Sequence, residues 1–384
     1  MTDIAKVPTV MVVFGTRPEA IKMAPVVRAL HDAPLRSSVV VTGQHRDMLD
    51  QVLQLFAITP DHDLDIMRHG QTLTDITVRV ISGLEKVLQQ ERPDVVLVHG
   101  DTTTALAGAL AAFYQRIPVG HVEAGLRTEN VYDPFPEEMN RRLIDRVAEM
   151  HFAPTQTAKQ NLLRENVPCS SVFVTGNTVI DALLSVVRPD YRFRDAHLAK
   201  IAALPERVLL VTTHRRENVG ERMVSVFRAL REILSRFPDT RVVFPVHKNP
   251  AVRTLVRQEL GELERVHLIE PPEYEEFAHL MSRAFLVLTD SGGIQEEAPA
   301  LGKPVLVLRE TTERPEGIAA GTLRKVGTAT ATIVAAASEL LSDSRAYACM
   351  AQTANPYGDG RAAQRIVEVL QARLLCWQKE AAPS

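Results

Sequence analysis

The sequence predicts an α/β protein made of two Rossmann-like domains, each built on a doubly wound parallel sheet. Short apolar, β-branched runs recur along the chain and alternate with amphipathic stretches of helical length. Strands buried on both faces have such continuous apolar sequences, and their alternation with helices is typical of right-handed βαβ units. A length of 384 residues exceeds one ordinary core and fits two domains of roughly 150–200 residues.

The expected strands fall into two series along the chain. The first series comprises Thr9–Phe14, Ser38–Thr42, Val95–His99, Val119–Val122, His151–Ala153 and Val172–Thr175. The second comprises Val208–Thr212, Val242–Val246, Val266–Ile269, Phe285–Thr289 and Pro304–Leu308. Helices are expected between these runs, for example over Thr102–Gln115 and Arg222–Arg236, and a last helix over Gly360–Gln378.

The polar segment Ser185–Glu206 holds no strand candidate and separates the two series. We therefore predict a first domain over residues 1–184, a linker over 185–206 and a second domain over 207–361. The sequence by itself leaves open which domain the last helix, 362–384, packs on.

Composition excludes several classes of partner. A formal net charge of −3 offers no basic surface for nucleic acid or an anionic membrane. The three cysteines, Cys169, Cys349 and Cys376, form neither a disulfide framework nor a zinc pattern, and they fit a reducing compartment. No stretch approaches the ~20 apolar residues of a membrane-spanning helix, and the first apolar run is too short for a signal sequence. We expect a cytoplasmic protein.

Polar and glycine-rich segments follow the expected strands at their carboxyl ends, where parallel sheets bind ligands. These segments are Gly15–Glu19, Gly100–Asp101, Glu123–Gly125, Thr213–Arg216 and Asp290–Gly293. Because they belong to both series, we predict an active site in a cleft between the two domains.

Ser291-Gly292-Gly293 follows a strand and opens a helix that carries Glu297 in its next turn. Unpaired first-turn amides favour an anion such as a diphosphate, and glycines let it approach the backbone. Glu297 is then placed to accept hydrogen bonds from ribose hydroxyls. The alternative is an ordinary glycine-rich turn with Ser291 as N-cap. The segment lacks the Lys-Ser/Thr of a P-loop.

Two segments with cationic side chains, one at the first helix and one after a strand of the second series, are further candidates for an anion site. Arg17 and Lys22 lie at or just inside the start of the first helix, where cations oppose the helix dipole, so a phosphate or carboxylate nearby would explain them. His214 closes a strand and precedes Arg215 and Arg216, so it is placed to donate to a departing diphosphate. The alternatives are solvated surface charges and a structural histidine.

Three carboxylates at predicted strand or helix ends are candidates for acid–base catalysis: Asp101, Glu123 and Glu137. Consecutive parallel strands place Asp101 and Glu123 at one edge of the sheet, and unlike environments would let them act as acid and base. Asp101 could instead be an N-cap, and Glu137 a first-turn residue favoured by the helix dipole. No metal-ligand spacing is present, so we expect neither a metal nor a redox cofactor.

Together these segments resemble the non-hydrolysing UDP-N-acetylglucosamine 2-epimerases of bacteria. The matching pieces occur in the family's order: GTRPEAIKMAP (15–25), TGQHRDML (42–49), HGDT (99–102), HVEAGLRT (121–128), FPEEMNR (135–141), THRREN (213–218), PVHKNP (245–250), TDSGGIQEEA (289–298) and NPYGDG (355–360). The resemblance implies a glycosyltransferase-B-like fold, a homodimer, and a last helix that returns to the first domain. It implies an interconversion of UDP-N-acetylglucosamine and UDP-N-acetylmannosamine through UDP and 2-acetamidoglucal.

Residue roles carried over from the family follow from the matching motif positions. Asp101, Glu123 and Glu137 correspond to its acid–base carboxylates and His214 to its stabiliser of the leaving group. The expected substrate contacts are Arg17, Lys22, Arg141, Phe277, Ser291, Gly292, Gly293, Glu297 and Arg314. Phe277 matches a residue that packs against uracil.

The resemblance also implies a second substrate site that activates the enzyme, made by Gln44, Gln71, Arg215 and His247. Asp47 and Gly70 differ from the Gln and Arg of some family members. Other functions stay open at this point: an epimerase for a related 2-acetamido UDP-sugar, a hydrolysing epimerase, a glycosyltransferase of the same fold, and a non-catalytic sugar-nucleotide sensor.

Overall fold

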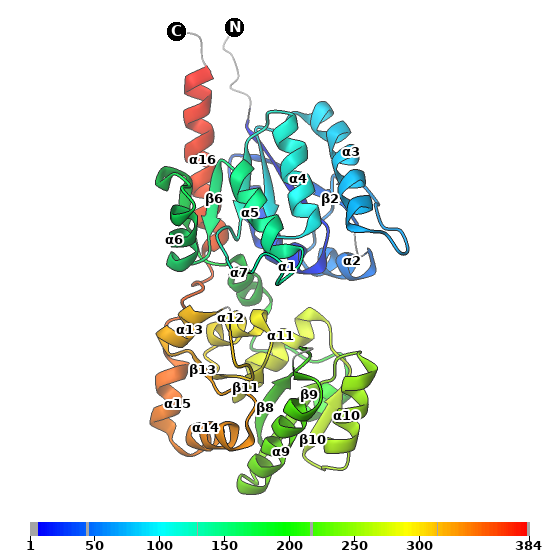
Figure 1. Cartoon of the computed structure of the whole chain (residues 1–384), viewed down its shortest axis with the longest axis vertical. Coiled ribbons are helices and arrows are strands. Elements are labelled where there is room, and N and C mark those ends of the chain that lie inside the picture. Colours follow the sequence, from blue (N-terminus) through cyan, green and yellow to red (C-terminus); the bar gives the residue numbers. More distant parts are fainter. Residues whose placement is uncertain (1–6, 44–45, 129, 216–217, 313, 382–384) are drawn as a thin grey trace. The chain divides into compact units, whose positions relative to one another are not determined.

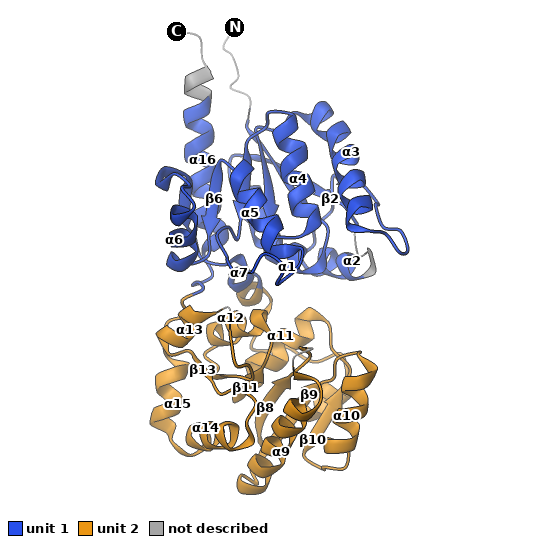
Figure 2. Cartoon of the chain, viewed as in Figure 1, with its two compact units in different colours: residues 1–182, 357–384 blue, residues 183–356 orange. Residues whose placement is uncertain are grey.

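The computed structural model describes residues 7–43, 46–128, 130–215, 218–312 and 314–381. In this part of the chain the strands form two parallel sheets, one of seven and one of six strands (Figure 1). The chain divides into two compact units: unit 1 contains residues 1–182 and 357–384, and unit 2 contains residues 183–356 (Figure 2). No helix of the described residues has both the length and the apolar character needed to cross a membrane.

Unit 1 contains the seven-stranded sheet, in the order β3-β2-β1-β4-β5-β6-β7. Its strands are β1 (Thr9–Phe14), β2 (Arg36–Val41), β3 (His62–Asp63), β4 (Val95–His99), β5 (Val119–Val122), β6 (Met150–Ala153) and β7 (Val172–Val174). Its helices are α1 (Arg17–His31), α2 (Arg46–Leu55), α3 (Leu73–Glu91), α4 (Thr103–Tyr114), α5 (Glu137–Val147), α6 (Gln156–Arg164), the 3₁₀ turn η1 (Cys169–Ser171) and α16 (Ala362–Ala381). Helix α16 packs against α1, which brings the end of the chain back to the first sheet.

Unit 2 contains the six-stranded sheet, in the order β10-β9-β8-β11-β12-β13. Its strands are β8 (Arg207–Thr212), β9 (Thr240–Pro245), β10 (Val266–Ile269), β11 (Leu286–Thr289), β12 (Val305–Val307) and β13 (Leu323–Lys325). Its helices are α8 (Ala196–Ala202), α9 (Glu221–Arg236), α10 (Pro250–Leu260), α11 (Tyr274–Arg283), α12 (Gly292–Ala300), α13 (Pro315–Ala320), α14 (Thr330–Ser342) and α15 (Ser344–Ala351). Helix α7 (Thr178–Val186) begins in unit 1 and ends in unit 2.

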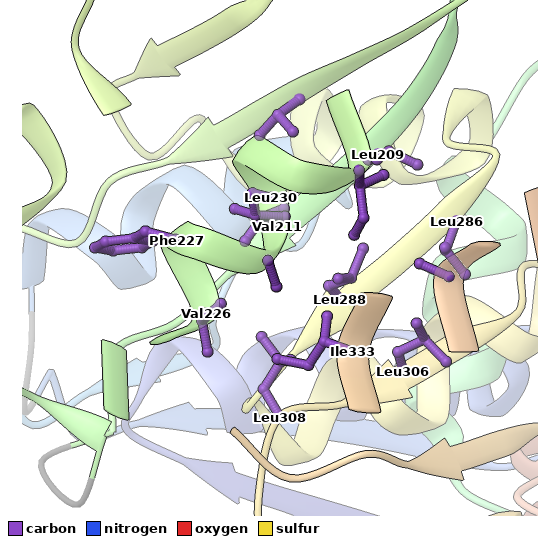
Figure 3. Close-up of a cluster of buried hydrophobic side chains, with 14 of the residues drawn as sticks. Leu209, Val211, Val226, Phe227, Leu230, Leu286, Leu288, Leu306, Leu308 and Ile333 are labelled. Atoms are coloured by element: carbon purple, nitrogen blue, oxygen red, sulfur yellow. The ribbon is translucent and has the colours of Figure 1, made fainter. Parts of the chain in front are cut away.

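A buried apolar core explains why the second sheet forms. Figure 3 shows Leu209, Val211, Leu286 and Leu288, from the adjacent strands β8 and β11, in one cluster that also contains Phe227 of α9. Each of these five side chains is fully buried. Both faces of a parallel sheet are buried, so side chains on both faces must be apolar. The strands are therefore unbroken apolar runs in the sequence.

Each sheet reverses its strand order once, between β1 and β4 in unit 1 and between β8 and β11 in unit 2. Ligands of doubly wound sheets bind outside the carboxyl ends of the strands at such a switch point. Gly15 and Gly100 directly follow β1 and β4, and Thr213 and Asp290 directly follow β8 and β11. The topology therefore gives each unit one expected binding edge.

The predicted fold class of two Rossmann-like parallel sheets is confirmed. Two short edge strands, β3 and β13, were not expected from the sequence, because runs of two and three residues carry little apolar signal. Residues 185–206, expected to be a linker, contain α8 and fall within unit 2, and residues 357–361, expected in the second domain, fall in unit 1.

Candidate active site

The turn between β1 and α1 is held by a buried carboxylate. Thr16 is the N-cap of α1, and its amide and that of Gly15 donate to Glu19 Oε2 at 2.8 and 3.0 Å. The hydroxyl of Thr102, on the turn after β4, donates to Glu19 Oε1 at 2.6 Å. Burial raises the pKa of the Glu19 carboxyl, although these hydrogen bonds oppose the shift. Glu19 thus joins the two turns at the switch point of unit 1.

Asp101 lies on the turn after β4, where helix α5 fixes both its side chain and its backbone. Arg141 of α5 donates to Asp101 Oδ2 through Nε at 3.0 Å and also through Nη2. One residue earlier, Asn140 Nδ2 donates to the Asp101 carbonyl at 2.8 Å. The carboxylate is therefore paired with a guanidinium and keeps partial exposure, at 24% of its side chain.

Glu123 follows β5 and has a φ of +66°, an uncommon conformation for a residue other than glycine. Its Oε2 accepts hydrogen bonds from Lys22 Nζ and from Asn177 Nδ2, the latter at 2.7 Å. A Cβ placed on Gly100 would lie 3.6 Å from Glu123 Oε1, so this carboxylate lies beside the turn that carries Asp101. The turn that carries Asp101 therefore lies next to the Glu123 carboxylate.

His99, the last residue of β4, lies behind Glu123 with its Nε2 at 3.9 Å from Glu123 Oε2. The ring is 3% exposed, and burial lowers the pKa of His99 to about 3 despite the opposing charge of Glu123. His99 is therefore neutral near pH 7, and Lys22 is the cation that contacts Glu123.

A pocket of about 470 Å³ opens at this edge of unit 1. It brings together Arg17, Asp101 and Glu137, which come from three different elements. The remaining lining residues are Thr16, Pro18, Met48, Leu73, Thr102, Thr103, Pro136 and Asn140. Glu137 is the first residue of α5, four residues before Arg141, so α5 supplies both a pocket carboxylate and the partner of Asp101.

In unit 2, the start of α12 presents a second cluster. Ser291 is the N-cap residue of α12, as the alternative interpretation expected, although its side chain makes no capping hydrogen bond. A Cβ on Gly292 would lie 3.7 Å from Arg314 Nη2 and 4.0 Å from Arg215 Nη2. Two guanidinium groups therefore converge on the amino end of α12, a combination suited to phosphate oxygens.

His214 lies beside this cluster and contacts a buried acid. Its Nδ1 is 3.2 Å from Oδ1 of Asp290, and its ring stacks on that of His247 with 5.6 Å between centroids. Burial opposes ionisation of Asp290, but hydrogen bonds from His214, Arg215 and Thr213 and the charge of His214 hold its pKa below the ordinary value. Asp290 is therefore a carboxylate.

The predicted ribose and uracil contacts lie on two adjacent helices of unit 2. Glu297 is 8% exposed on α12, and Tyr274 of α11 donates its hydroxyl to Glu297 Oε1 at 3.2 Å. Phe277 is half-buried one turn further along α11. A Cβ on Gly293 would lie 3.7 Å from Glu297 Oε2, so the carboxylate lies near the helix start.

The residues predicted for a second substrate site do not all lie in one cluster of the structure. Arg215 and His247 belong to the cluster around His214. Gln71 lies just before α3 and accepts a hydrogen bond from the Arg68 amide at 3.2 Å, whereas Gln44 lies outside the described residues. Whether these residues form a second site stays a prediction, as does the cleft between the two domains.

Sequence reasoning missed the groups that hold the predicted residues in place: Glu19, Asn140, Asn177 and Asp290. Each of them contacts a residue far away in the sequence; Glu19 and Thr102, for example, are separated by 83 positions. Glu19, Asn140 and Asp290 lie within the motif segments, which was the one available signal, whereas Asn177 lies outside all of them. Among the described residues, no group of three or more His, Cys, Asp or Glu side chains is arranged to hold a metal ion.

Comparisons with known proteins agree with this geometry. Residues 28–371 match the family model described as UDP-N-acetylglucosamine 2-epimerase. The chain is 56% identical to the UDP-N-acetylglucosamine 2-epimerase of Escherichia coli K12, covering 94% of this chain and 98% of that protein. It is 55% identical to the Bacillus subtilis enzyme of the same name, covering 94% of each.

A solved structure gives the same result. The UDP-GlcNAc 2-epimerase of Neisseria meningitidis, crystallised with UDP-GlcNAc, is 51% identical, with a TM-score of 0.84 over 95% of this chain and all of that one. Matches of this identity cover 94–95% of the chain, and the family model extends over residues of both sheets. The chain therefore belongs to the family of UDP-N-acetylglucosamine 2-epimerases.

Proposed function

We propose that this enzyme reversibly inverts C2 of UDP-N-acetylglucosamine to give UDP-N-acetylmannosamine, without releasing free sugar. The observation that carries the proposal is the arrangement of three carboxylates in unit 1. Asp101 and Glu137 line one pocket, and Glu123 lies beside the turn after β4 that carries Asp101. Inversion at a carbon needs one group to remove a proton and another to return one to the opposite face, and carboxylates serve both roles.

The proposed reaction is an elimination followed by an addition. A base removes the C2 proton while the C1–O bond breaks, and the bonding electrons stay on the β-phosphate oxygen of UDP. The resulting 2-acetamidoglucal is held by the enzyme, UDP adds back at C1, and a proton is delivered to the other face of C2. Because the C2 hydrogen is weakly acidic, its removal is coupled to departure of UDP.

The carboxylates differ in their surroundings, which supports different roles. Asp101 is paired with Arg141 of α5, whereas Glu123 contacts Lys22 of α1 and Asn177, so each carboxylate is held by a different element. Glu137 lies in the first turn of α5, where the helix dipole favours a negative charge. Charged carboxylates also stabilise the positive character that grows on the sugar ring as UDP leaves.

The leaving diphosphate is assigned to unit 2. The amino end of α12, Arg215 and Arg314 supply donors for its oxygens, and Glu297 and Phe277 are the proposed contacts of ribose and uracil. His214 would donate to the β-phosphate oxygen as negative charge grows on it. Preorganised donors at such an oxygen stabilise the transition state more than the ground state. The proposal requires one substrate molecule to meet residues of both units.

Deuterium incorporation tests the proposal. Pure protein is incubated with UDP-N-acetylglucosamine in deuterated water, and the products are identified by NMR. We expect deuterium at C2 of both UDP-linked epimers and no free sugar. Free N-acetylmannosamine would indicate a hydrolysing epimerase, and transfer only to an added acceptor would indicate a glycosyltransferase. Binding without exchange would indicate a sensor.

The finer assignments of substrate and context are part of the proposal. The same exchange experiment with other 2-acetamido UDP-sugars would define the sugar, and the product would suit synthesis of surface polysaccharides in the cytoplasm. Activation through a second substrate site at Gln44, Gln71, Arg215 and His247 predicts sigmoidal rates against substrate concentration. Sedimentation equilibrium would test the expected homodimer.

A further inference from the structure

The buried carboxylate of Asp290 has no role in the reaction as written so far, yet it contacts four described residues of the segment that carries His214. Its Oδ2 accepts hydrogen bonds from Thr213 Oγ1 at 2.8 Å, Asn218 Nδ2 at 2.9 Å and the Arg215 amide at 3.1 Å. Asp290 itself is fully buried. A carboxylate in this position fixes the backbone that follows β8.

The second oxygen of Asp290 faces the imidazole of His214. Oδ1 lies 3.2 Å from His214 Nδ1, and it also accepts from the His214 amide at 3.2 Å. Hydrogen-bond donors therefore surround the carboxylate, and an ionised carboxylate only accepts. The hydrogen of the pair must then reside on Nδ1 of His214.

We propose that Asp290 is a positioning residue for the epimerase reaction: it holds His214 in the form protonated at Nδ1 and stabilises the imidazolium that faces the leaving diphosphate through Nε2. This inference rests on the function proposed above. With Nδ1 bound to Asp290, the imidazole has Nε2 as its remaining polar atom, and 39% of the His214 side chain is exposed.

The proposed step balances in both directions. When the C1–O bond breaks, the electron pair stays on the β-phosphate oxygen, and the Nε2–H of the imidazolium donates to that oxygen. If the proton moves, His214 is left neutral with its hydrogen on Nδ1, which Asp290 continues to accept. Return of UDP to C1 restores the proton to Nε2. The logic matches that of a histidine oriented by a buried aspartate in a hydrolase triad.

The other groups around His214 do not compete for Nδ1. His247 stacks on its ring at an interplanar angle of 23°, and burial together with the positive charge of His214 lowers the pKa of His247. Arg253 adds to that effect, while Arg215 and Arg314 direct their guanidinium groups toward Gly292. Asp290 is therefore the acidic group that contacts the His214 ring among the described residues.

The ¹⁵N chemical shifts of the His214 ring test the pairing without any need for turnover. The protein is labelled on histidine and saturated with UDP, and His214→Asn identifies the signals. We expect Nδ1 to be protonated in the wild type. In Asp290→Asn, an amide group facing the ring should move the hydrogen to Nε2. A wild-type signal showing unprotonated Nδ1 would overturn the proposal.

A double-mutant cycle separates positioning from a structural role. Asp290→Asn should lower kcat about 100-fold, the usual range for loss of acid–base assistance, with the Kd for UDP changed less than about threefold. In the His214→Asn background the same change should lower kcat less than about threefold, because Asp290 acts through His214. Equal losses in both backgrounds would show that Asp290 only supports the fold.

A matched control is Asp343→Asn, which alters a helix-capping carboxylate in the same unit and should keep wild-type kcat. If the wild type catalyses no epimerisation, the proposed function fails, whereas the NMR measurement still decides the Asp290–His214 pairing. Wild-type kcat in Asp290→Asn would contradict the inference even if the tautomer changes.

Discussion

At the scale of single residues, the candidate catalytic groups are held by specific partners and, in one case, by an unusual backbone. Glu123 adopts a φ of +66°, which costs a non-glycine residue about 1–3 kcal/mol. Its carboxylate accepts from Lys22 and Asn177, so contacts from other elements maintain this conformation. Such local strain is typical of functional sites, because surrounding structure must hold the side chain where the chemistry needs it.

Neutral amide variants test the three carboxylates directly. Asp101→Asn, Glu123→Gln and Glu137→Gln should each lower kcat about 100-fold or more, because an amide neither removes nor delivers a proton. Binding of UDP, assigned to unit 2, should change little and is measured by calorimetry. Asp75→Asn, an exposed carboxylate on α3, is the control. Wild-type turnover in all three variants would refute the assigned roles.

His99 predicts how stability depends on pH. Its pKa is about 3 in the folded protein against 6.5 for an ordinary histidine. Between these values the unfolded chain binds a proton that the folded protein excludes, so the free energy of unfolding falls as pH falls. His99 should account for a loss of about 1 kcal/mol between about pH 6.5 and pH 5.5.

Urea unfolding of wild type and His99→Gln at these two pH values measures this contribution. The variant should lose about 1 kcal/mol less stability on acidification than the wild type, because glutamine does not titrate. An identical pH dependence in both proteins would show that His99 accepts its proton without unfolding.

At the scale of elements, helix α5 and the turn after β4 form one assembly. Two successive carbonyls of this turn accept from side chains, Gly100 from His121 Nε2 at 2.7 Å and Asp101 from Asn140 Nδ2 at 2.8 Å. His121 in turn contacts Asp145 of α5 at 2.6 Å. The helix that supplies Glu137 therefore also fixes Asp101, and a shift of α5 would misplace two carboxylates together.

The turn after β5 gives a prediction at this scale. Gly125 has a φ of +85°, and a Cβ there would lie 2.3 Å from the carbonyl oxygen of Ala158, a backbone atom. Gly125→Ala should therefore destabilise unit 1 by about 1–3 kcal/mol and lower kcat, because Glu123 lies two residues earlier. Thermal unfolding and steady-state rates measure both effects.

Gly70→Ala is the matched control for Gly125→Ala. Gly70 has a φ of +70°, but a Cβ there would meet no atom within 4 Å. It should cost only about 1 kcal/mol for the left-handed backbone. Equal effects of the two variants would mean that the contact with Ala158 is relieved at no cost.

At the scale of the whole molecule, the candidate site residues are divided between two compact units with separate cores. The proposed acid–base carboxylates belong to unit 1, whereas the proposed diphosphate and nucleoside contacts belong to unit 2. A two-unit chain can bind UDP with one unit before the sugar meets the other. In the proposed reaction, exclusion of water would then keep the glycal intermediate from escaping.

We predict that binding of substrate or UDP makes the molecule more compact. Small-angle X-ray scattering with and without UDP should show a smaller radius of gyration in the bound state. Asp75→Asn protein should respond like the wild type. Identical dimensions in both states would contradict closure of the units around the ligand.

Much of the fold and many of the candidate site residues could be predicted from the sequence. Buried strands such as β1 and β4 are unbroken apolar runs, and the residues that follow them are marked by glycine and by charge. The edge strands β3 and β13 were missed because their pairing, rather than their composition, makes them strands. Helix α8 was missed because a seven-residue polar helix has little periodicity to detect.

The sequence by itself determined the βαβ order, the two sheets, the family and the strand-end segments, because these depend on local composition and on motifs a few residues long. Only the tertiary structure decided which charges pair: Arg141 with Asp101, Lys22 with Glu123, and Asp290 with His214. Hydrogen bonds and ion pairs depend on distances of a few ångströms between residues 40 to 101 positions apart. No pattern along the chain encodes those distances, since they exist only once the sheets have formed.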